Sequence, residues 1–285
     1  MPSKYAFDTS KLWDFYHYPE KHYVKPFRIY GNLWFVGNDD VGSYLMDTEE
    51  GLVLIDTTYP TSRAQMIESI WEAGFDPRNI KHIIHTHGHF DHIGTTAFLQ
   101  TLSGARTYLG EGDAKMFRER PELLLAKDAG PAFIEVFKPD VEIHDGDVYQ
   151  FGSTNIRCVA TPGHTMGVFT FFITLCEDGK EQIAALCGGI GINTLCRDFI
   201  EEFDVAYYRD YFADSMKKIM YEPVDIVLGN HTPQNDTLGK RARMLEDPDG
   251  PNPFINPAEW TPFIQRALAN YEQMLQDEQN GTDQK

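Results

Sequence analysis

The segment that most constrains the structure of this chain is residues 86–92, with the sequence Thr-His-Gly-His-Phe-Asp-His. The segment follows an apolar run at 83–85 that is typical of a buried strand, and the sequence after Asp91 has helical character. Neutral imidazoles and carboxylates are ligands that Zn²⁺ takes in proteins, so this strand-to-helix loop predicts a metal site. The alternative is a polar loop without metal, which would leave several buried donors to satisfy.

Two further histidines stand at the ends of predicted strands. His164 lies in a Thr-Pro-Gly-His-Thr turn after the run 157–160, and His231 follows the run 224–228. Loops at strand ends often carry functional side chains. Each histidine alone could equally be an ordinary turn residue. Together with the cluster at 87–92 they indicate one composite site.

The rest of the chain reads as two β-rich halves, each followed by helices. The first half contains β-rich runs at 27–30, 33–36, 43–46 and 52–56, which predict an antiparallel meander. The second begins at Val141 and continues at 147–151, 155–160, 168–175 and 183–187. Helical spacing is found at 61–73, 206–220 and 257–276, the last starting near Asn256. We therefore expect an α/β protein, a four-layer αβ/βα sandwich of two mixed β-sheets flanked by helices.

The 285 residues could form one large domain or two modest ones. No linker or low-complexity segment separates the two halves, which favours a single domain at 27–276. Residues 1–26 are rich in aromatics and prolines, and we expect an irregular N-terminal arm that lies across the domain. Residues 277–285 are polar, and we expect a frayed tail.

Charge and composition limit the classes of partner that the protein is expected to bind. Lys and Arg total 25 against 43 Asp and Glu, and the net charge of −18 disfavours nucleic acid and anionic membranes as partners. The chain has no apolar run of membrane length and no apolar signal region near Met1, so we expect a cytoplasmic protein with a small-molecule substrate. The sequence does not address its oligomeric state. Cysteines without metal-type spacing, which we expect to be reduced thiols, stand at Cys158, Cys176, Cys187 and Cys196.

The histidine pattern resembles that of the metallo-β-lactamase superfamily, from about residue 27 to the C-terminus. The residues that carry the resemblance are His87, His89, Asp91, His92, His164 and His231. It implies the metallo-β-lactamase fold and two zinc ions per chain. The first zinc would bind His87, His89 and His164. The second would bind Asp91, His92 and His231.

The resemblance also gives a role to Asp56, which matches a strand-end aspartate that supports the ligand loop. The alternative is an ordinary turn residue at a strand end. Within the superfamily the chain is most similar to subclass B3 metallo-β-lactamases, through residues 249–257 and the Asp-Gly-Lys hairpin at 178–180.

One departure from the family pattern concerns the strand that ends near Leu186. Many superfamily hydrolases place a metal-bridging carboxylate there, and other lactamases a cysteine, but residues 187–193 contain no acid. Gly188 or Gly189 replaces the serine expected in subclass B3, and Cys187 is more typical of a packed thiol than of a ligand. This departure favours a hydroxide-bridged or loosely held second zinc and argues against the glyoxalase and flavodiiron branches.

The resemblance implies a binuclear zinc hydrolase in which a metal-bound hydroxide attacks a carbonyl, with Asp91 as the catalytic residue that orients it. Opening of a β-lactam is the first candidate activity, and hydrolysis of a lactone, thioester or other ester or amide is the alternative. A nuclease is disfavoured by the charge. A metal-binding module without catalysis is disfavoured by the intact ligand set.

The substrate is not determined by the sequence. Asn193, Thr194 and Arg197 could meet a substrate carboxylate, and Tyr208 or Tyr211 could line the mouth of the site, although surface or packing roles are the alternative. Residues 112–135 and the N-terminal arm could both cover the cleft.

Overall fold

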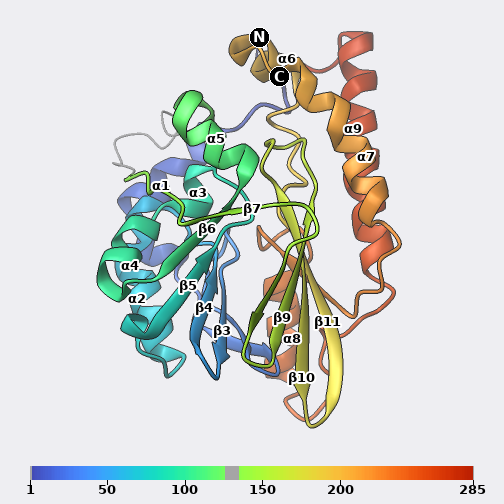
Figure 1. Cartoon of the computed structure of the whole chain (residues 1–285). Coiled ribbons are helices and arrows are strands. Elements are labelled where there is room, and N and C mark those ends of the chain that lie inside the picture. Colours follow the sequence, from blue (N-terminus) through green and yellow to red (C-terminus); the bar gives the residue numbers. More distant parts are fainter. Residues whose placement is uncertain (1, 126–134, 285) are drawn as a thin grey trace.

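Two β-sheets pack face to face in the computed structural model, and helices cover the outer face of each sheet (Figure 1). The structure describes residues 2–125 and 135–284. Within these residues the first sheet has seven strands, in the order β1-β2-β3-β4-β5-β6-β7, and the second has five, in the order β12-β11-β10-β9-β8. The predicted four-layer α/β sandwich is confirmed.

The strands of the first sheet are β1 (Phe27–Tyr30), β2 (Leu33–Phe35), β3 (Tyr44–Thr48), β4 (Gly51–Ile55), β5 (Ile80–Ile84), β6 (Arg106–Gly110) and β7 (Val141–Ile143). Those of the second are β8 (Val148–Phe151), β9 (Thr154–Ala160), β10 (Phe169–Glu177), β11 (Lys180–Cys187) and β12 (Ile226–Gly229). Strands β1 to β4 form the predicted antiparallel meander, and β4 to β7 are parallel. In the second sheet only β12 pairs in parallel, with β11, so both sheets are mixed as predicted.

The prediction that the second β-rich half begins at Val141 is wrong. Val141 pairs in parallel with Tyr108 of β6, so β7 is the last strand of the first sheet. A three-residue strand carries too little pattern to reveal its partner, because the pairing is decided by the packing of the whole sheet.

Alternation along the strands separates the layers. In the first sheet, Leu45 and Leu54 pack against helices on the outer face, whereas Tyr44 and Ile55 belong to the core between the sheets. The same alternation in β10 places Phe171 in the core between the sheets. Successive side chains of a strand point to opposite faces, so each of these strands contributes both to the core between the sheets and to the contact with the outer helices.

The α-helices are α1 (Leu12–His17), α2 (Arg63–Glu72), α3 (Phe90–Ile93), α4 (Thr96–Ser103), α5 (Glu111–Glu119), α6 (Arg197–Phe203), α7 (Arg209–Ile219), α8 (Thr237–Glu246) and α9 (Trp260–Asn280). Short 3-10 segments are η1 (Thr9–Lys11), η2 (Pro19–His22), η3 (Pro60–Ser62), η4 (Pro77–Asn79), η5 (Pro121–Leu124) and η6 (Ala206–Tyr208). Among the described residues, none of these helices has both the length and the apolar character needed to cross a bilayer.

The helix bounds differ from the prediction at several ends. The predicted helix 61–73 begins with a 3-10 turn, and its Trp71 is 50% exposed. Helix α9 begins at Trp260 because the chain turns at 256–259, where the Asn256 side chain accepts a hydrogen bond from the Ala258 N–H. It continues to Asn280, beyond the predicted end at 276.

The two ends of the chain are held together, which corrects the expectation of a frayed tail. The Lys4 N–H donates to the carbonyl of Asp283 at 2.7 Å, and Ser3 forms a β-bridge with Gln284. The two ends lie beside each other near α6 and α9 (Figure 1). The N-terminal arm is also more regular than expected, because it contains η1, α1 and η2. We call residues 3–8 the N-terminal strap.

Candidate metal centre

Strand ends from both sheets deliver the predicted site residues to one place. The loop after β5 carries His87 and His89, and α3 follows it directly with Asp91 and His92. The second sheet contributes His164 after β9 and His231 after β12. These residues form two groups, His87-His89-His164 and Asp91-His92-His231, and within each group the candidate ligand atoms lie within 4.8 Å of one another.

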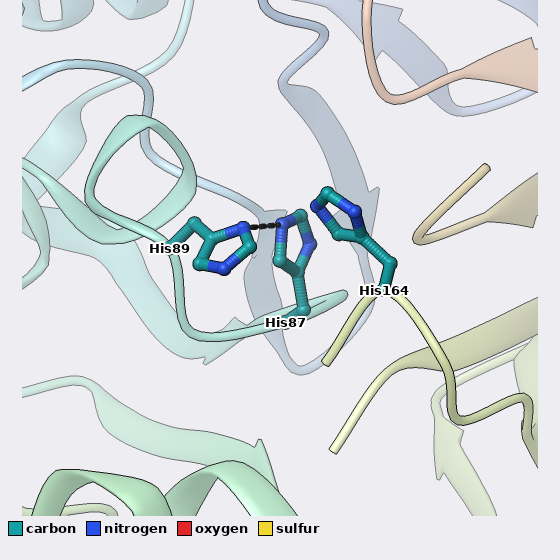
Figure 2. A group of neighbouring side chains, drawn as sticks. All are labelled: His87, His89 and His164. Carbon is teal, nitrogen blue, oxygen red and sulfur yellow. Dashed lines mark hydrogen bonds between the residues drawn. The ribbon is translucent and has the colours of Figure 1, made fainter. Parts of the chain in front are cut away.

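The first group consists of three buried imidazoles turned toward one another (Figure 2). Nε2 of His87 lies 3.1 Å from Nδ1 of His89. Burial lowers the pKa values of His87 and His89 well below the usual range, and it lowers the pKa of His164 to about 3. All three rings are therefore neutral at pH 7 and have a lone pair free for a cation.

The second group is a triangle of donor atoms. Nε2 of His92 lies 3.4 Å from Nε2 of His231, and Oδ2 of Asp91 lies 3.6 Å from the first nitrogen and 3.5 Å from the second. In a tetrahedral site with zinc–ligand bonds of about 2.0–2.1 Å, neighbouring donors are roughly 3.3–3.4 Å apart. The spacing of the second group matches that requirement, and the 3.1 Å between His87 and His89 in the first group is close to it, so these donors fit zinc.

Asp56 supports the loop that carries the ligands. It directly follows β4, is fully buried, and accepts hydrogen bonds from the backbone N–H and the hydroxyl of Thr86 at 2.9 and 2.7 Å. Its Oδ2 also accepts from Nδ1 of His92 at 2.9 Å, which leaves Nε2 of that ring to face the second group. Burial would raise the pKa of Asp56, but His92 and His85 lower it to about 2. Asp56 therefore makes the contacts expected of the family's supporting aspartate.

The outer nitrogens of His164 and His231 also have partners. Nδ1 of His164 donates to the carbonyl of Gly191 at 2.9 Å, and the Thr194 hydroxyl donates to the carbonyl of His164 at 2.7 Å. Nδ1 of His231 lies 3.4 Å from Oδ1 of Asp40. Although burial alone would lower the pKa of His231, the hydrogen bond and charge of Asp40 raise it to about 9. Each ring is thus oriented by a partner outside the donor groups.

Asp113 is the residue that sequence reasoning missed. This buried carboxylate of α5 accepts from the Gly88 N–H at 2.7 Å, the Thr165 hydroxyl at 2.8 Å and the Gly167 N–H at 2.9 Å. It therefore ties the loop of His87 to the loop of His164. Burial raises its pKa to about 6, and the three hydrogen bonds oppose that rise. A signal for this contact is Gly167, because a Cβ there would lie 2.3 Å from the Asp113 nitrogen.

The glycines after β11 explain the missing strand-end acid. A Cβ at Gly188 would lie 2.4 Å from the carbonyl oxygen of Phe169, and one at Gly189 would lie 2.8 Å from Cβ of His164. Neither position has room for a side chain, so a bridging carboxylate cannot stand there without a shift of the backbone. Cys187 is fully buried among apolar side chains and belongs to neither donor group. All four cysteines are free thiols.

The residues considered for substrate binding lie in different environments, and only some of them line the cleft. Asn193 lines the cleft beside both donor groups. Arg197 is bonded to Glu278 instead, with its guanidinium 2.7 Å from the carbonyl of that residue. Tyr208 is buried between helices, whereas Tyr211 is exposed. From the segment 112–135, Leu125 lines the cleft, and residues 126–134 lie outside the described part of the chain.

A four-layer αβ/βα sandwich with imidazole and carboxylate donors at the shared edge of its sheets defines a class of metal-dependent hydrolases. The sequence profile of the metallo-beta-lactamase superfamily matches residues 36–176, and the chain belongs to that superfamily. It is a metallo-hydrolase of this fold.

Several proteins are similar to the chain in sequence. YobT of Bacillus subtilis, an uncharacterized protein, is 30% identical over 142 residues, which are 47% of this chain and 57% of YobT. An uncharacterized protein of Mycobacterium bovis is 30% identical over 180 residues, which are 61% of this chain and 75% of that protein. The hydroxyacylglutathione hydrolase GloC of Haemophilus influenzae is 26% identical over 225 residues, 75% of this chain and 92% of GloC.

Solved structures of metallo-beta-lactamases share the fold over most of their length. BJP-1, a subclass B3 enzyme of Bradyrhizobium japonicum, superposes with a TM-score of 0.80 at 25% identity and covers 91% of this chain and 97% of its own. FEZ-1 of Legionella gormanii superposes with a TM-score of 0.80 at 27% identity, over 90% of this chain and 98% of its own. The similarity to subclass B3 expected from the sequence is confirmed.

Proposed function

We propose that the protein is a binuclear zinc hydrolase that opens a carbonyl substrate. The observation that carries the proposal is the pair of donor groups, in which six side chains from both sheets converge with spacings that fit two zinc ions. Structural groups of this kind would be closed to solvent, whereas His89, Asp91, His164 and His231 line a cleft.

The metal and the protein side chains would contribute different parts of the hydrolysis reaction. Bound zinc supplies a hydroxide nucleophile at neutral pH and a Lewis acid for the carbonyl. His87, His89 and His164 would hold the first ion, and His92 and His231 would hold the second together with Asp91. Asp91 would act as the catalytic residue, because its carboxylate lies at the edge of the second group and lines the cleft from which substrate approaches.

A β-lactam is the first candidate substrate, because the solved structures reported above are metallo-beta-lactamases. A thioester is the second, because GloC is named a hydroxyacylglutathione hydrolase. Lactones and other esters or amides present the same carbonyl to a hydroxide, so they belong in the same screen.

The test begins with the metal content of protein expressed in zinc-replete medium. We expect about two zinc ions per chain, and a value below about one would instead support a metal-binding module without catalysis. Turnover of nitrocefin, a γ-lactone and an acylglutathione is then measured for wild type, His87→Ala and Asp91→Asn. The variant His144→Ala is the matched control, because that histidine is exposed and lies outside both groups.

The proposal predicts that at least one substrate is hydrolysed and that the rate falls by about 100-fold or more in His87→Ala and Asp91→Asn, with His144→Ala unchanged. Nitrocefin turnover would support the lactamase activity. Turnover of the lactone or thioester without nitrocefin would assign the alternative hydrolase activity. Zinc-loaded protein that hydrolyses none of them above the His87→Ala background would contradict the proposal.

A further inference from the structure

The N-terminal strap forms part of the wall of the candidate active site. Phe7 lines the cleft together with His89, Asp91 and His164. The same side chain lines an adjoining outer pocket, so it stands between the two spaces. Its ring packs edge-on against Phe90, with ring centroids 6.2 Å apart. A substrate held at the donor groups would therefore meet Phe7 wherever it extends toward the outer pocket.

The strap is held by α6 and the C-terminal helix α9 rather than by the cleft itself. The Ser3 N–H donates to Oδ2 of Asp198 at 2.7 Å. The Lys4 ammonium lies 2.7 Å from Oδ2 of Asp277, and the Tyr5 hydroxyl donates to the same oxygen at 2.5 Å. These contacts fix the strap directly before Phe7. The phenyl ring is thus a placed wall of the cleft and not a loose chain end.

The lining of the inner cleft is apolar or neutral outside the donor groups. Phe7, Phe90 and Leu125 supply apolar surface, and the polar side chains are the amides of Asn193, Asn230 and Gln234. Among the described residues that line it, the inner cleft has no lysine or arginine.

The outer pocket also has an apolar wall and few cationic side chains. Leu12, Phe15 and Tyr59 give it an apolar wall. Lys4 is its one lysine or arginine among the described lining residues and is already paired with Asp277, and His231 belongs to the second donor group; the acids of the pocket are Asp8 and Asp40. An anionic group on a substrate would meet more carboxylates than ammonium groups there, within a protein of net charge −18.

The two spaces together are large enough for a substrate with an extended apolar group. The inner cleft has a volume of about 70 Å³ and the outer pocket of about 460 Å³. Binding sites for small molecules typically enclose roughly 300–1,000 Å³. Burial of an alkyl chain against Phe7 and Phe15 would be favourable, at about 0.8 kcal/mol per methylene group.

We propose that this cleft selects carbonyl substrates that carry an uncharged apolar group, and that Phe7 is the specificity-determining residue that receives this group. The inference rests on the proposed hydrolase function and narrows its substrate class. The preferred substrates carry a neutral acyl chain in the outer pocket, and those whose chain ends there in a carboxylate are disfavoured.

Three p-nitrophenyl esters test the inference with the zinc-loaded full chain. In each, water adds across the acyl–oxygen bond, which gives the carboxylic acid and p-nitrophenol. The hexanoate carries an apolar chain, the acetate lacks it, and the adipate half-ester replaces the terminal methyl group by a carboxylate of similar reach. We expect kcat/KM for the hexanoate to exceed that for the acetate by roughly 30-fold and that for the half-ester by about 100-fold.

Variants of the strap test whether Phe7 is the residue that sets the substrate preference. Phe7→Ala should lower kcat/KM for the hexanoate about tenfold and change that for the acetate less than about twofold. Trp13→Ala is the matched control, because this aromatic residue of the same arm is 61% exposed and lines neither space. Phe7→Lys should raise kcat/KM for the half-ester about tenfold, because it adds the missing cation. This gain does not depend on whether Phe7→Ala folds.

The outcomes separate the two proposals. If all three esters remain at the His87→Ala background, and nitrocefin and the thioester do as well, the hydrolase function fails. If the esters are hydrolysed but the half-ester is preferred, or the acetate equals the hexanoate, the hydrolase function stands and the inference on substrate class is overturned. Equal effects of Phe7→Ala on hexanoate and acetate, in a variant that keeps its zinc, would remove the role of Phe7.

Discussion

Asp113 and Asp40 are carboxylates outside the donor groups, yet they act on different parts of the ligand loops. Asp113 binds backbone N–H groups and a hydroxyl, so it fixes where the loops of His87 and His164 lie relative to each other. Asp40 lies against the outer ring nitrogen of His231 and also accepts from the Tyr59 hydroxyl at 2.6 Å. The first sets the position of donor atoms, and the second sets the charge of one of them.

Replacement of Asp113 by asparagine tests the positioning role. An amide nitrogen would face one of three donors that now point at the carboxylate, so a buried hydrogen bond is lost at a cost of about 1–3 kcal/mol. We expect zinc affinity of the first group to fall by about 10- to 100-fold, measured by competition with a chromogenic chelator. Glu119→Gln, at an exposed position of the same helix, is the control. Unchanged affinity in Asp113→Asn would contradict the role.

The charge of His231 makes zinc binding by the second group dependent on pH. Its folded pKa of about 9 lies above the ordinary value of 6.5, so the proton stabilises the metal-free fold below about pH 6.5, and this contribution is lost as the pH rises through about 9. Zinc competes with that proton, because a protonated imidazole cannot bind a metal. Affinity of the second group should therefore rise up to about tenfold per pH unit below pH 9.

Calorimetry in buffers of different ionisation enthalpy measures the proton released with the second zinc. In Asp40→Asn the release should shrink at pH 7 to 8, because the pKa of His231 returns toward its ordinary value. Proton release that is the same in wild type and Asp40→Asn would show that Asp40 does not set the charge of this ring.

At the scale of elements, the C-terminal end of α9 is held by a buried acid. Glu278 is 6% exposed and accepts from the Arg209 guanidinium at 2.8 Å to each oxygen, which joins α9 to α7. It also accepts from the Arg197 N–H at 2.7 Å, at the start of α6. The end of α9 thereby fixes the place where the strap is attached.

Glu278→Ala should destabilise the protein strongly for a single truncation. It leaves Arg209 without its bidentate partner, and loss of one member of a mostly buried pair costs about 2–4 kcal/mol. Urea unfolding followed by circular dichroism measures the change in the free energy of unfolding. Glu272→Ala, at an exposed position of the same helix, should change it by less than about 0.5 kcal/mol. Equal effects of the two substitutions would contradict this account of α9.

A feature was predictable where it depends on residues near one another in the sequence, and not where it depends on distant packing. The six histidine and aspartate donors follow short β-rich runs in sequence, so their convergence at one sheet edge was predictable from local pattern. The partner of β7 and the exposure of Trp71 depend on distant packing that the pattern does not contain. Asp113 was missed because two of its three partners are backbone N–H groups, which almost every residue possesses. The N-terminal arm was considered as a cover of the cleft, but Phe7 as the residue that lines it was not predictable, because contacts with α6 and α9 position the strap.

At the scale of the whole molecule, the net charge of −18 sets how substrates approach. It repels anions over roughly 10 Å at moderate ionic strength and less as salt is added. We expect kcat/KM for the anionic half-ester to rise several-fold between about 20 mM and about 500 mM NaCl, while that for the neutral hexanoate changes less than about 1.5-fold. Parallel salt responses for the two esters would show that the field of the protein does not contribute to selection.

The β-bridge between Ser3 and Gln284 makes this fold suitable for circular permutation. A chain in which these two residues are joined by a short glycine-rich linker would keep the strap, its contacts with α9 and the cleft wall. The two-residue turn at Asp178-Gly179, between β10 and β11, is a suitable place to open it. The new ends would lie at the opposite end of the molecule (Figure 1), where a tag or a surface linkage stays away from the metal centre.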